Sequence, residues 1–510
     1  MTHPTKKPTS QHNPRNIQPL GNLLLSINPT QTSIHRINSL GSLSILSDEI
    51  ILKIFSELDP SSLHLLQGVS RYFFGWCVGL DGLWKSAYLS QHDTLENWNG
   101  TWRSTFLGRS HLETDPIQLN QVYSDVLFQP ILAATYDISS AIGIKKRSNK
   151  FRPTIQRVSV DSKSIIERKI PQILLGLMET WSARKWTLDT LSARFPNVKF
   201  RAESSLISLS NYQLYHHRCQ TEESPVYLFD ADFVEKTSGF VETQSLGLEY
   251  HVPEVFGNDL LGSLGPDQRP DFRWLIIGPT RSGSTWHKDP NGTSAWNAVI
   301  SGKKLWICFP PDCTPPGVRV SEDESEVESP LSIAEWFINY YELSKEEFGP
   351  KAQDPSKRGK MLEGICEAGE IFYVPSGWWH LVVNLEPSIA ITQNFVSEHE
   401  LVEVLKFMKS RSDQLSGFRK IERMEEVLEK FINALRSNPK LISAEVLNES
   451  LNRIEEKQVG INTKNKRKNH HHGQSEGSMW EKLKQPRLEE TIVNESNGFC
   501  FGFLVEEESL

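Results

Sequence analysis

The sequence predicts an α+β protein of several domains, in which an antiparallel β-barrel is flanked by helices at both ends. Three observations support this fold class. The chain of 510 residues is too long for one compact core. Short β-branched and aromatic runs, separated by Gly, Pro and Asn turns, fill residues 203–400. Apolar positions at helical spacing lie on both sides of that region.

Composition narrows the class of protein. An apolar content of 38% with 14 tryptophans predicts a substantial core, and a net charge of −8 argues against a general nucleic-acid binder. The six cysteines form no C-x-x-C pair, which favours reduced thiols over a disulfide framework or a structural zinc site. The first residues lack the apolar core of a signal peptide, and no run has the length of a membrane span. We therefore expect a soluble nuclear or cytoplasmic protein that contacts neither membrane nor nucleic acid.

The N-terminal part divides into two segments. Residues 1–42 are rich in Pro, Ser, Thr and Asn without sustained periodicity, so we expect them to be disordered. Residues 43–90 have a helical pattern that Ser47 or Asp48 could cap. Asp59-Pro60 separates two helices whose apolar positions are Ile50, Ile51, Ile54, Phe55 and Leu58, then Leu63, Leu65, Leu66 and Val69.

The remaining segments follow in order. Residues 91–202 mix helix and loop, and we expect a helical linker that leads into the β-region. The expected strands of the barrel are SPVYLFD, FRWLIIGP, SAWNAVI, KLWICFPP, EIFYVP, HLVVNL and IAITQNFV. Residues 401–456 predict helices whose apolar stripes are Leu401, Val404, Leu405 and Met408, then Met424, Val427, Leu428, Phe431 and Leu435. Residues 457–510 predict a polar, disordered tail, in which KNKRKNHHH (464–472) is either a nuclear-import signal or a solvated linker.

A possible metal site lies in the barrel region. Side chains at positions i and i+2 of a strand point to the same face, so His287 and Asp289 can grip one ion. His380 begins another strand after a Pro-Ser-Gly turn and supplies a third ligand. Two imidazoles and one carboxylate on one face form the facial triad of non-haem iron(II) oxygenases, which leaves three coordination positions open. Taken alone, His380 is better interpreted as a satisfied, half-buried histidine without a ligand role.

A lysine in the same region favours the metal hypothesis. The stretch SAWNAVISGKKLWICFP predicts a hairpin that turns at Ser301-Gly302, and alternation puts Lys304, Trp306 and Cys308 on one face. A lysine inside a barrel is costly unless a partner neutralises it. A dicarboxylate that chelates iron through one end would present its other carboxylate to Lys304, whereas the parity of Lys303 predicts a solvated surface charge. The last strand adds two hydrogen-bonding side chains of one parity, those of Thr392 and Asn394.

Residues 203–400 resemble a Jumonji-C domain. Proteins of this family have a cupin-type double-stranded β-helix fold and oxidise their substrates with Fe(II), O2 and 2-oxoglutarate. The resemblance rests on RWLIIGPTRSGSTWHKDPNGTSAWNAVISGKKLW, VPSGWWHLVVNLEPSIAITQNF and SPVYLFD. Within that family the segment is most similar to the lysyl hydroxylases also described as arginine demethylases and as phosphatidylserine receptors.

The resemblance implies roles for individual residues. Iron would be held by His287, Asp289 and His380, and the distal carboxylate of 2-oxoglutarate by Lys304 and Thr392. The pocket would be lined by Asn297 and Asn394, with Ser284 where the family has Thr and with Tyr212 as a further carboxylate partner. The basic, serine-rich tail of those relatives has no counterpart here, so RNA binding is not expected.

Residues 43–90 resemble an F-box, and the alternative is an ordinary small helical cluster. The resemblance rests on the opening Leu46-Ser47-Asp48-Glu49-Ile50, the break at Leu58-Asp59-Pro60, and the later Val69-Ser70-Arg71 and Leu83-Trp84-Lys85. It implies binding of a Skp-type adaptor through an apolar surface around Leu46, Ile50, Ile54 and Leu58.

These inferences predict an iron- and 2-oxoglutarate-dependent hydroxylase of protein side chains, with lysine expected and arginine as the alternative target. Removal of N-methyl groups from histones or arginine uses the same oxidant, and a non-enzymatic substrate receptor of a ubiquitin ligase is the rival from another class. An acidic stretch lies between the two metal-binding segments, and we expect it near the barrel mouth, where it would attract a basic peptide. The alternative is that this acidic stretch is a solvated loop that only maintains solubility. Its acidic residues are Glu322, Asp323, Glu324, Glu326 and Glu328.

Overall fold

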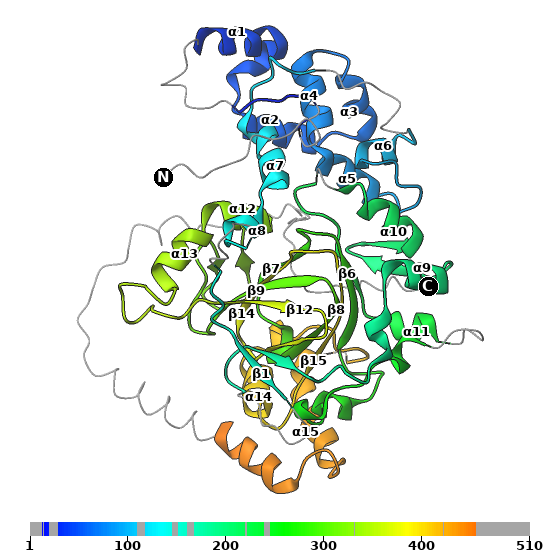
Figure 1. Cartoon of the computed structure of the whole chain (residues 1–510), viewed down its shortest axis with the longest axis vertical. Coiled ribbons are helices and arrows are strands. Elements are labelled where there is room, and N and C mark those ends of the chain that lie inside the picture. Colours follow the sequence, from blue (N-terminus) through cyan, green and yellow to red (C-terminus); the bar gives the residue numbers. More distant parts are fainter. Residues whose placement is uncertain are drawn as a thin grey trace, which may run out of the picture.

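The computed structural model describes residues 13, 15–19, 29–109, 118–144, 151–160, 168–219, 222–238, 245–330, 332–421 and 423–454. Helices α1 to α6 lie at one end of the molecule, the β-barrel lies in the middle, and α14 and α15 lie at the opposite end (Figure 1). In the described part of the chain, no helix combines the length and the apolar character needed to cross a membrane. The predicted tail and its KNKRKNHHH segment lie outside the described residues.

The N-terminal helices begin where the sequence predicts them. Asp59 caps the second predicted helix by accepting hydrogen bonds from the backbone N–H groups of Ser61 and Ser62, and Pro60 occupies its first turn. Ser70 caps the next helix through the N–H of Phe73. The bounds are α2 Asp48–Ser56, α3 Pro60–Leu66, α4 Arg71–Gly79, α5 Asp81–Leu89 and α6 Trp102–Phe106.

One helix contradicts the expectation of disorder over residues 1–42. Helix α1 (Pro29–Leu40) has no strong amphipathic pattern, so periodicity did not reveal it. Tertiary contacts hold its C-terminal end, because Leu40 is buried and Arg36 forms an ion pair of 2.5 Å with Asp48 of α2. Composition alone does not report such contacts.

Two sheets form the predicted barrel, and their strand pairs are antiparallel except for the pair of β1 with β2. The larger has nine strands in the order β1-β2-β13-β8-β15-β6-β5-β3-β4, and the smaller has four in the order β12-β9-β14-β7. From β6 onward the chain repeatedly changes sheet, which is the topology of a double-stranded β-helix. The bounds in the larger sheet are β1 Gln156–Ser159, β2 Gln172–Leu175, β3 Lys199–Ala202, β4 Ser205–Ser208, β5 Leu228–Asp230, β6 Arg273–Gly278, β8 Ser294–Ser301, β13 Ile371–Val374 and β15 Ser388–Phe395. Those in the smaller sheet are β7 Gly283–His287, β9 Lys303–Phe309, β12 Leu362–Glu367 and β14 Trp379–Asn384.

The β-region begins earlier than the predicted boundary at residue 203. Strands β1, β2 and β3 precede that boundary, and all three belong to the larger sheet. Each has only four residues, and β1 pairs with β2 in parallel rather than as a hairpin. Strands this short provide too little alternation for recognition in the sequence.

The predicted hairpin at Ser301-Gly302 is wrong, although the predicted side-chain parity is correct. Strand β8 lies in the larger sheet and β9 in the smaller, so Gly302 carries the chain between sheets. Its φ is +82°, and a Cβ at this position would lie 2.2 Å from the carbonyl oxygen of Pro387. On β9, Trp306 and Cys308 face the barrel interior. The alternate residues Leu305, Ile307 and Phe309 pack on the outer face.

Two helices that the sequence did not predict cover that outer face. Helices α12 (Ile333–Asn339) and α13 (Tyr341–Phe348) follow a short hairpin of β10 (Arg319–Val320) and β11 (Val327–Glu328). Trp336 of α12 packs against Trp286 of β7 with ring centroids 5.1 Å apart. Both faces of the smaller sheet are therefore covered, which explains why β9 and β14 are almost entirely buried.

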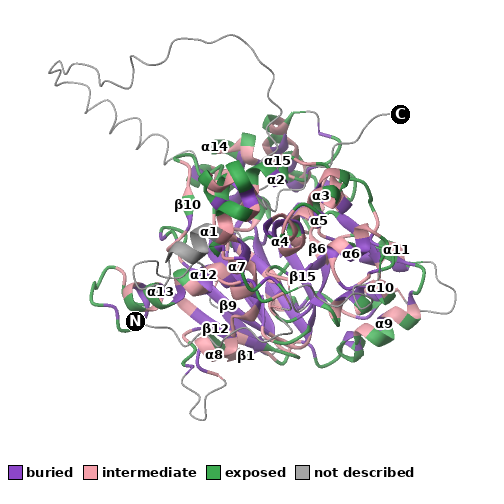
Figure 2. Cartoon of the chain, turned by 90° about the horizontal axis from the view of Figure 1, so that it is seen from above, coloured by how far each residue is buried: buried purple, intermediate pink, exposed green. Residues whose placement is uncertain are grey.

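The N-terminal helices share one continuous core with the barrel. Trp98 packs edge-on against Tyr215 at 4.9 Å, and Lys85 of α5 pairs with Glu203 at 2.7 Å. Buried residues concentrate on the strands, and exposed residues lie on outer helices such as α13 and α15 (Figure 2). The other helices are α7 Asp125–Thr135, α8 Ile138–Ala141, α9 Leu188–Arg194, α10 Leu209–His216 and α11 Phe233–Thr237.

The C-terminal helices confirm the predicted apolar stripes. Helices α14 (Leu401–Ser410) and α15 (Val427–Arg436) pack together in a separate core cluster. Its buried members include Leu401, Val404, Leu405, Met408, Val427, Phe431 and Leu435.

The turn at Gly302 yields a stability prediction. We expect Gly302→Ala to lower the free energy of unfolding by about 3 kcal/mol or more, since it combines a positive φ with a clash against fixed backbone. Gly359→Ala is a matched control, because Gly359 has a φ of +77° but open space around it, and its cost should stay near 1 kcal/mol. Urea denaturation measures both, and equal losses would contradict the assigned clash.

Candidate active site

Two neighbouring strands of the smaller sheet bring the three predicted metal ligands together. His287 ends β7, His380 lies near the start of β14, and the antiparallel register places them opposite each other. Asp289 follows β7 by two residues in extended backbone. One potential ligand atom from each of the three residues lies within 4.8 Å of the others. The separate sequence segments therefore form a single cluster.

Backbone carbonyls fix the tautomers of both histidines. His287 Nδ1 lies 2.7 Å from the carbonyl oxygen of Thr285, and His380 Nδ1 lies 3.0 Å from that of Trp378. A carbonyl oxygen can only accept, so each Nδ1 carries the proton and each Nε2 carries the lone pair. Burial lowers the pKa of each histidine to about 4, and for His287 the neighbouring His380 adds to this effect. Both rings are therefore neutral at pH 7, the form that binds metals.

The aspartate supplies a test of whether the cluster suits a cation. Burial raises the pKa of Asp289, while His287 and a hydrogen bond from Asn394 oppose that rise. Asn394 Nδ2 donates to Asp289 Oδ1 at 3.3 Å, whereas Asp289 Oδ2 is buried without a hydrogen-bond partner among the described residues. A buried carboxylate oxygen without a donor is costly unless a cation lies beside it. Two neutral imidazole nitrogens and one carboxylate oxygen fit iron(II).

The three ligands line a cavity of about 120 Å³. Four of the predicted pocket residues also line it, namely Ser284, Asn297, Thr392 and Asn394. Thr392 and Asn297 are direct neighbours across β15 and β8, and the Asn297 Oδ1 is buried without a partner among the described residues. The Thr392 hydroxyl donates to the carbonyl oxygen of Trp296 at 2.9 Å. The cavity wall therefore offers hydrogen-bonding groups next to the ligands.

Lys304 lies fully buried behind this wall. Its Nζ donates to the hydroxyl of Tyr227 at 2.7 Å and to Oδ1 of Asn384 at 2.9 Å. In the described residues no carboxylate forms an ion pair with it, and burial lowers its pKa to about 7. Tyr227 lines the cavity, so Lys304 is hydrogen-bonded to a residue of the cavity wall. An anionic ligand group at this end would supply the missing counter-charge. Lys303, in contrast, is partly exposed and pairs with Glu367 and Glu386, as its parity predicted.

The prediction for Tyr212 is wrong. Its hydroxyl donates to the carbonyl oxygens of Val226 and Ile277 inside the protein core, and Tyr212 does not line the cavity. Tyr227, and not Tyr212, lines the cavity and contacts Lys304. Asn384 is the second hydrogen-bond partner of this lysine. Both lie in segments that were predicted to be strands, SPVYLFD and HLVVNL. Their contact with Lys304 depends on which strands pair, and no sequence signal reports that pairing.

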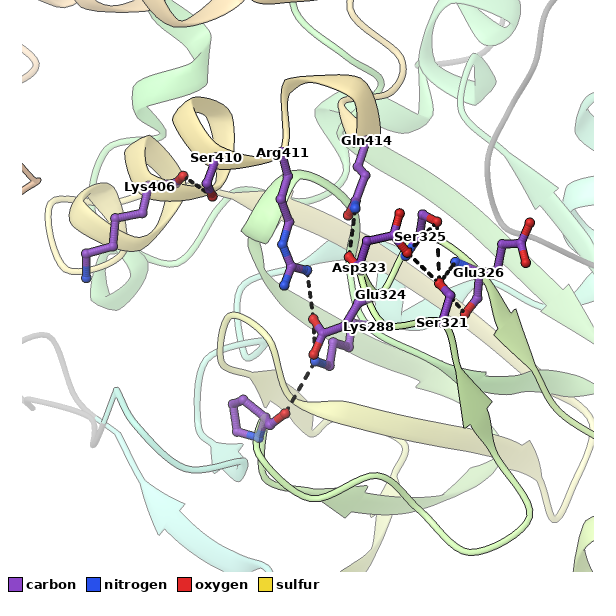
Figure 3. A network of polar contacts seen from close by, with 11 residues as sticks. Lys288, Ser321, Asp323, Glu324, Ser325, Glu326, Lys406, Ser410, Arg411 and Gln414 are labelled. Atoms are coloured by element: carbon purple, nitrogen blue, oxygen red, sulfur yellow. Dashed lines mark hydrogen bonds and ion pairs between the residues drawn. The ribbon is translucent and has the colours of Figure 1, made fainter. Parts of the chain in front are cut away.

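The acidic stretch contacts Lys288 of the metal-binding loop (Figure 3), and its position at the barrel mouth stays a prediction. Glu324 pairs with Lys288, the residue between the first two ligands, at 3.6 Å and with Arg411 at 2.7 Å. One acidic charge is therefore already matched, whereas Glu322 and Glu326 are exposed to solvent.

A β-barrel that presents this ligand set to a cavity defines the class of cupin-like metal-dependent oxygenases. The family model for a cupin-like domain matches residues 158–400, which include strands that precede residue 203. Arginine-specific demethylase JMJ22 of Arabidopsis thaliana is 39% identical over 437 residues, covering 83% of this chain and 81% of that protein. This chain therefore belongs to the Jumonji-C family and is an oxygenase dependent on 2-oxoglutarate and Fe(II).

Two further relatives match shorter parts of the chain. Bifunctional arginine demethylase and lysyl-hydroxylase psr-1 of Caenorhabditis elegans is 34% identical over 264 residues, covering 49% of this chain and 63% of that protein. 2-Oxoglutarate and iron-dependent oxygenase JMJD4 of Danio rerio is 30% identical over 189 residues, covering 35% of this chain and 39% of that protein.

The first prediction for this site concerns the metal. We expect Asp289→Ala, His287→Ala or His380→Ala to lower conversion of 2-oxoglutarate to succinate by about a hundredfold or more, together with loss of bound iron. The melting temperature should change little, since these side chains face a cavity rather than fill the core. The control is His399→Ala, an exposed histidine just after β15 that does not line the cavity. Iron retention by Asp289→Ala would contradict the assignment.

A second prediction concerns Lys304. We expect Lys304→Ala to weaken 2-oxoglutarate binding by about 2 kcal/mol or more, roughly thirtyfold in Kd, because a charge-assisted contact in a closed pocket is lost. Lys303→Ala should change Kd little, since its charge is partly exposed to solvent. Isothermal titration calorimetry measures both, and the reverse ranking would contradict the strand register.

The same residue predicts a pH dependence. The pKa of Lys304 is lowered to about 7 by burial in the free protein, and a bound carboxylate would raise it. Binding then takes up protons above about pH 7, and affinity falls as the pH rises through that value. Titrations in buffers of different ionisation enthalpy should show this proton uptake in the parent protein and its absence in Lys304→Ala.

Proposed function

We propose that this chain hydroxylates positively charged side chains, lysine or arginine, in basic segments of other proteins. His287, Asp289 and His380 would hold iron(II), and Lys304 with Tyr227 and Thr392 would bind the far carboxylate of 2-oxoglutarate. The observation that carries the proposal is one cavity that combines the uncompensated Asp289 oxygen with Tyr227, whose hydroxyl accepts a hydrogen bond from the buried Lys304 behind the wall. A dicarboxylate bound between a cation and this lysine satisfies both.

The overall reaction balances without a further reductant. Iron(II) bound at this site would supply the oxidation of a substrate C–H bond to C–OH, coupled to conversion of 2-oxoglutarate and O2 into succinate and CO2. The residues of the chain orient the reactants: the carbonyls of Thr285 and Trp378 hold the two imidazoles, and Asn394 holds the carboxylate of Asp289. Apolar strands around them exclude bulk water.

Two observations support a basic protein substrate. The acidic stretch 321–328 is held beside the metal-binding loop by the ion pair of Glu324 with Lys288, and it would increase the encounter rate of cationic peptides at low salt. The relative from Caenorhabditis elegans is named for lysyl hydroxylation and arginine demethylation.

Demethylation is the second candidate outcome. The relative that covers 83% of this chain is named an arginine-specific demethylase. Hydroxylation of an N-methyl carbon gives an unstable product that releases formaldehyde, so the same cavity serves both outcomes.

The test is mass spectrometry of basic, neutral and methylated peptides after incubation with the protein, iron(II), ascorbate and 2-oxoglutarate. We expect gains of about 16 Da on lysine or arginine of basic peptides, from insertion of one oxygen atom. We expect the rate to fall with added salt, and more weakly once Glu322 and Glu326 are changed to Gln. Equal turnover of neutral peptides, or reaction of methylated peptides alone with formaldehyde release, would contradict the proposed substrate.

We further propose that residues 43–90 act as an F-box that binds a Skp-type adaptor. The supporting observation is an apolar surface on the N-terminal helices, where Ile50 and Ile54 of α2 are 48% and 38% exposed. Leu65 and Val69 are exposed as well, whereas Leu46 and Leu58 are partly buried against the core. Adaptor binding and oxidation are compatible, because this surface lies on helices outside the barrel.

The adaptor proposal is tested with the full chain and a purified Skp-type adaptor. Ile50→Asp combined with Ile54→Asp should weaken binding by about tenfold or more, because two apolar contacts are lost. Leu343→Asp on α13, where Leu343 is 41% exposed, is the matched control and should leave binding unchanged. No binding by the unmodified chain would leave these helices as a structural cap.

A further inference from the structure

The wall of the cavity contains one acidic side chain besides the metal ligand Asp289, as far as the described residues show. This residue, Asp271, lies just before β6, and a short series of contacts connects it to the metal centre. The backbone N–H of Asn394 donates to the carbonyl oxygen of Phe272 at 2.7 Å, and the side chain of Asn394 donates to Asp289. The main chain beside Asp271 is thus fixed relative to the ligands.

An arginine of the same chain already pairs with this carboxylate. Arg419 donates through Nη2 to Asp271 Oδ1, and both side chains remain partly exposed. Arg419 belongs to a segment that we call the strap, residues 411–421, and Ser416 and Gly417 of the strap line the cavity. Such partly exposed ion pairs contribute little to stability, so another cation can replace Arg419.

The strap is anchored independently of this ion pair. Asn291, in the loop after Asp289, exchanges two hydrogen bonds of 3.0 Å with the backbone of Ser416. On the other side, Arg411 and Gln414 contact Glu324 and the carbonyl oxygen of Asp323 (Figure 3). Loss of the Arg419 contact would therefore leave the strap in place, and the carboxylate would become available to a ligand.

Aromatic side chains surround the same part of the cavity. Phe229 and Trp274 line it with ring centroids 5.4 Å apart, and the buried indole N–H of Trp274 has no hydrogen-bond partner among the described residues. The ring of Phe272 lies 3.6 Å from the guanidinium carbon of Arg269, so this wall already accommodates a cation against an aromatic face. A carboxylate next to aromatic rings favours a cationic side chain over a neutral one.

We infer that Asp271 is the residue that binds the charged end of the substrate side chain and that Arg419 occupies this position until substrate arrives. The inference rests on the proposed function and specifies how the same cavity selects a lysine or arginine side chain. Burial raises the pKa of Asp271 and the pairing with Arg419 opposes that rise, so the carboxylate is stabilised by whichever cation lies beside it. Substrate binding then replaces the Arg419–Asp271 ion pair by an ion pair between Asp271 and the substrate. The position of the charged substrate group determines which carbons of its side chain lie near the metal.

The experiment measures binding without turnover. The full chain, loaded with manganese(II) and 2-oxoglutarate, is titrated with labelled Gly/Ser peptides that carry one central Lys, Arg or norleucine. We expect the Lys and Arg peptides to bind about tenfold more tightly than the norleucine peptide. Comparison of the Lys peptide with the Arg peptide shows whether an ammonium or a guanidinium group is preferred. Asp271→Asn should reduce this ratio to below about threefold and leave the affinity for norleucine unchanged, whereas Arg419→Gln should strengthen cationic binding by about threefold.

Asp267→Asn is the matched control. Asp267 pairs with Lys420 at 3.2 Å, next to Arg419 in the strap, but does not line the cavity, so this variant should retain the full ratio. An undiminished ratio in Asp271→Asn, or no preference for cationic peptides in the parent protein, would overturn the inference.

Mass spectrometry of the same peptides separates this inference from the proposed function. Oxidation of the peptides that is insensitive to Asp271→Asn would overturn the role of Asp271 and retain the proposed function. A cationic preference that depends on Asp271 without any mass change would retain the binding site and overturn the proposed reaction.

Discussion

The barrel interior holds two polar groups that the chain does not satisfy by itself. Among the described residues, the ammonium group of Lys304 donates hydrogen bonds to the neutral partners Tyr227 and Asn384, and Asp289 Oδ2 has no donor. Apolar side chains of similar volume would be more stable at both positions. The surrounding structure preserves this arrangement, because Gly278 leaves the room that Asn384 and Tyr227 need: a Cβ there would lie 2.7 Å and 2.6 Å from their atoms. The site is therefore complete only when a cation lies beside Asp289 and an anionic group lies near Lys304.

The metal-binding loop is also supported from outside the barrel. Lys288, which lies between His287 and Asp289, does not line the cavity and pairs with Glu324 (Figure 3). Asn291 attaches the same loop to the strap by two hydrogen bonds. Ligand geometry therefore depends on the β10–β11 hairpin and on residues that follow α14, although neither contributes a ligand.

The sequence correctly predicted those features that depend only on the alternation of side chains along a single strand. The shared face of His287 and Asp289, and the opposite directions of Lys303 and Lys304, follow from a period of two within one strand. The errors concern contacts between distant segments. Choosing Tyr212 instead of Tyr227, and placing a hairpin at Ser301-Gly302, both required knowledge of strand pairing, and helices α1, α12 and α13 depend on tertiary packing more than on their own periodicity.

The continuous core between the N-terminal helices and the barrel limits how this architecture could have arisen. Domains joined by a flexible linker can be exchanged by recombination without loss of either fold. Here a break between the two regions would expose Trp98 and Tyr215 and separate Leu95 from its backbone partner Leu206. Replacing either region by another domain would therefore require matching changes across this shared core, so the helices and the barrel are not interchangeable parts.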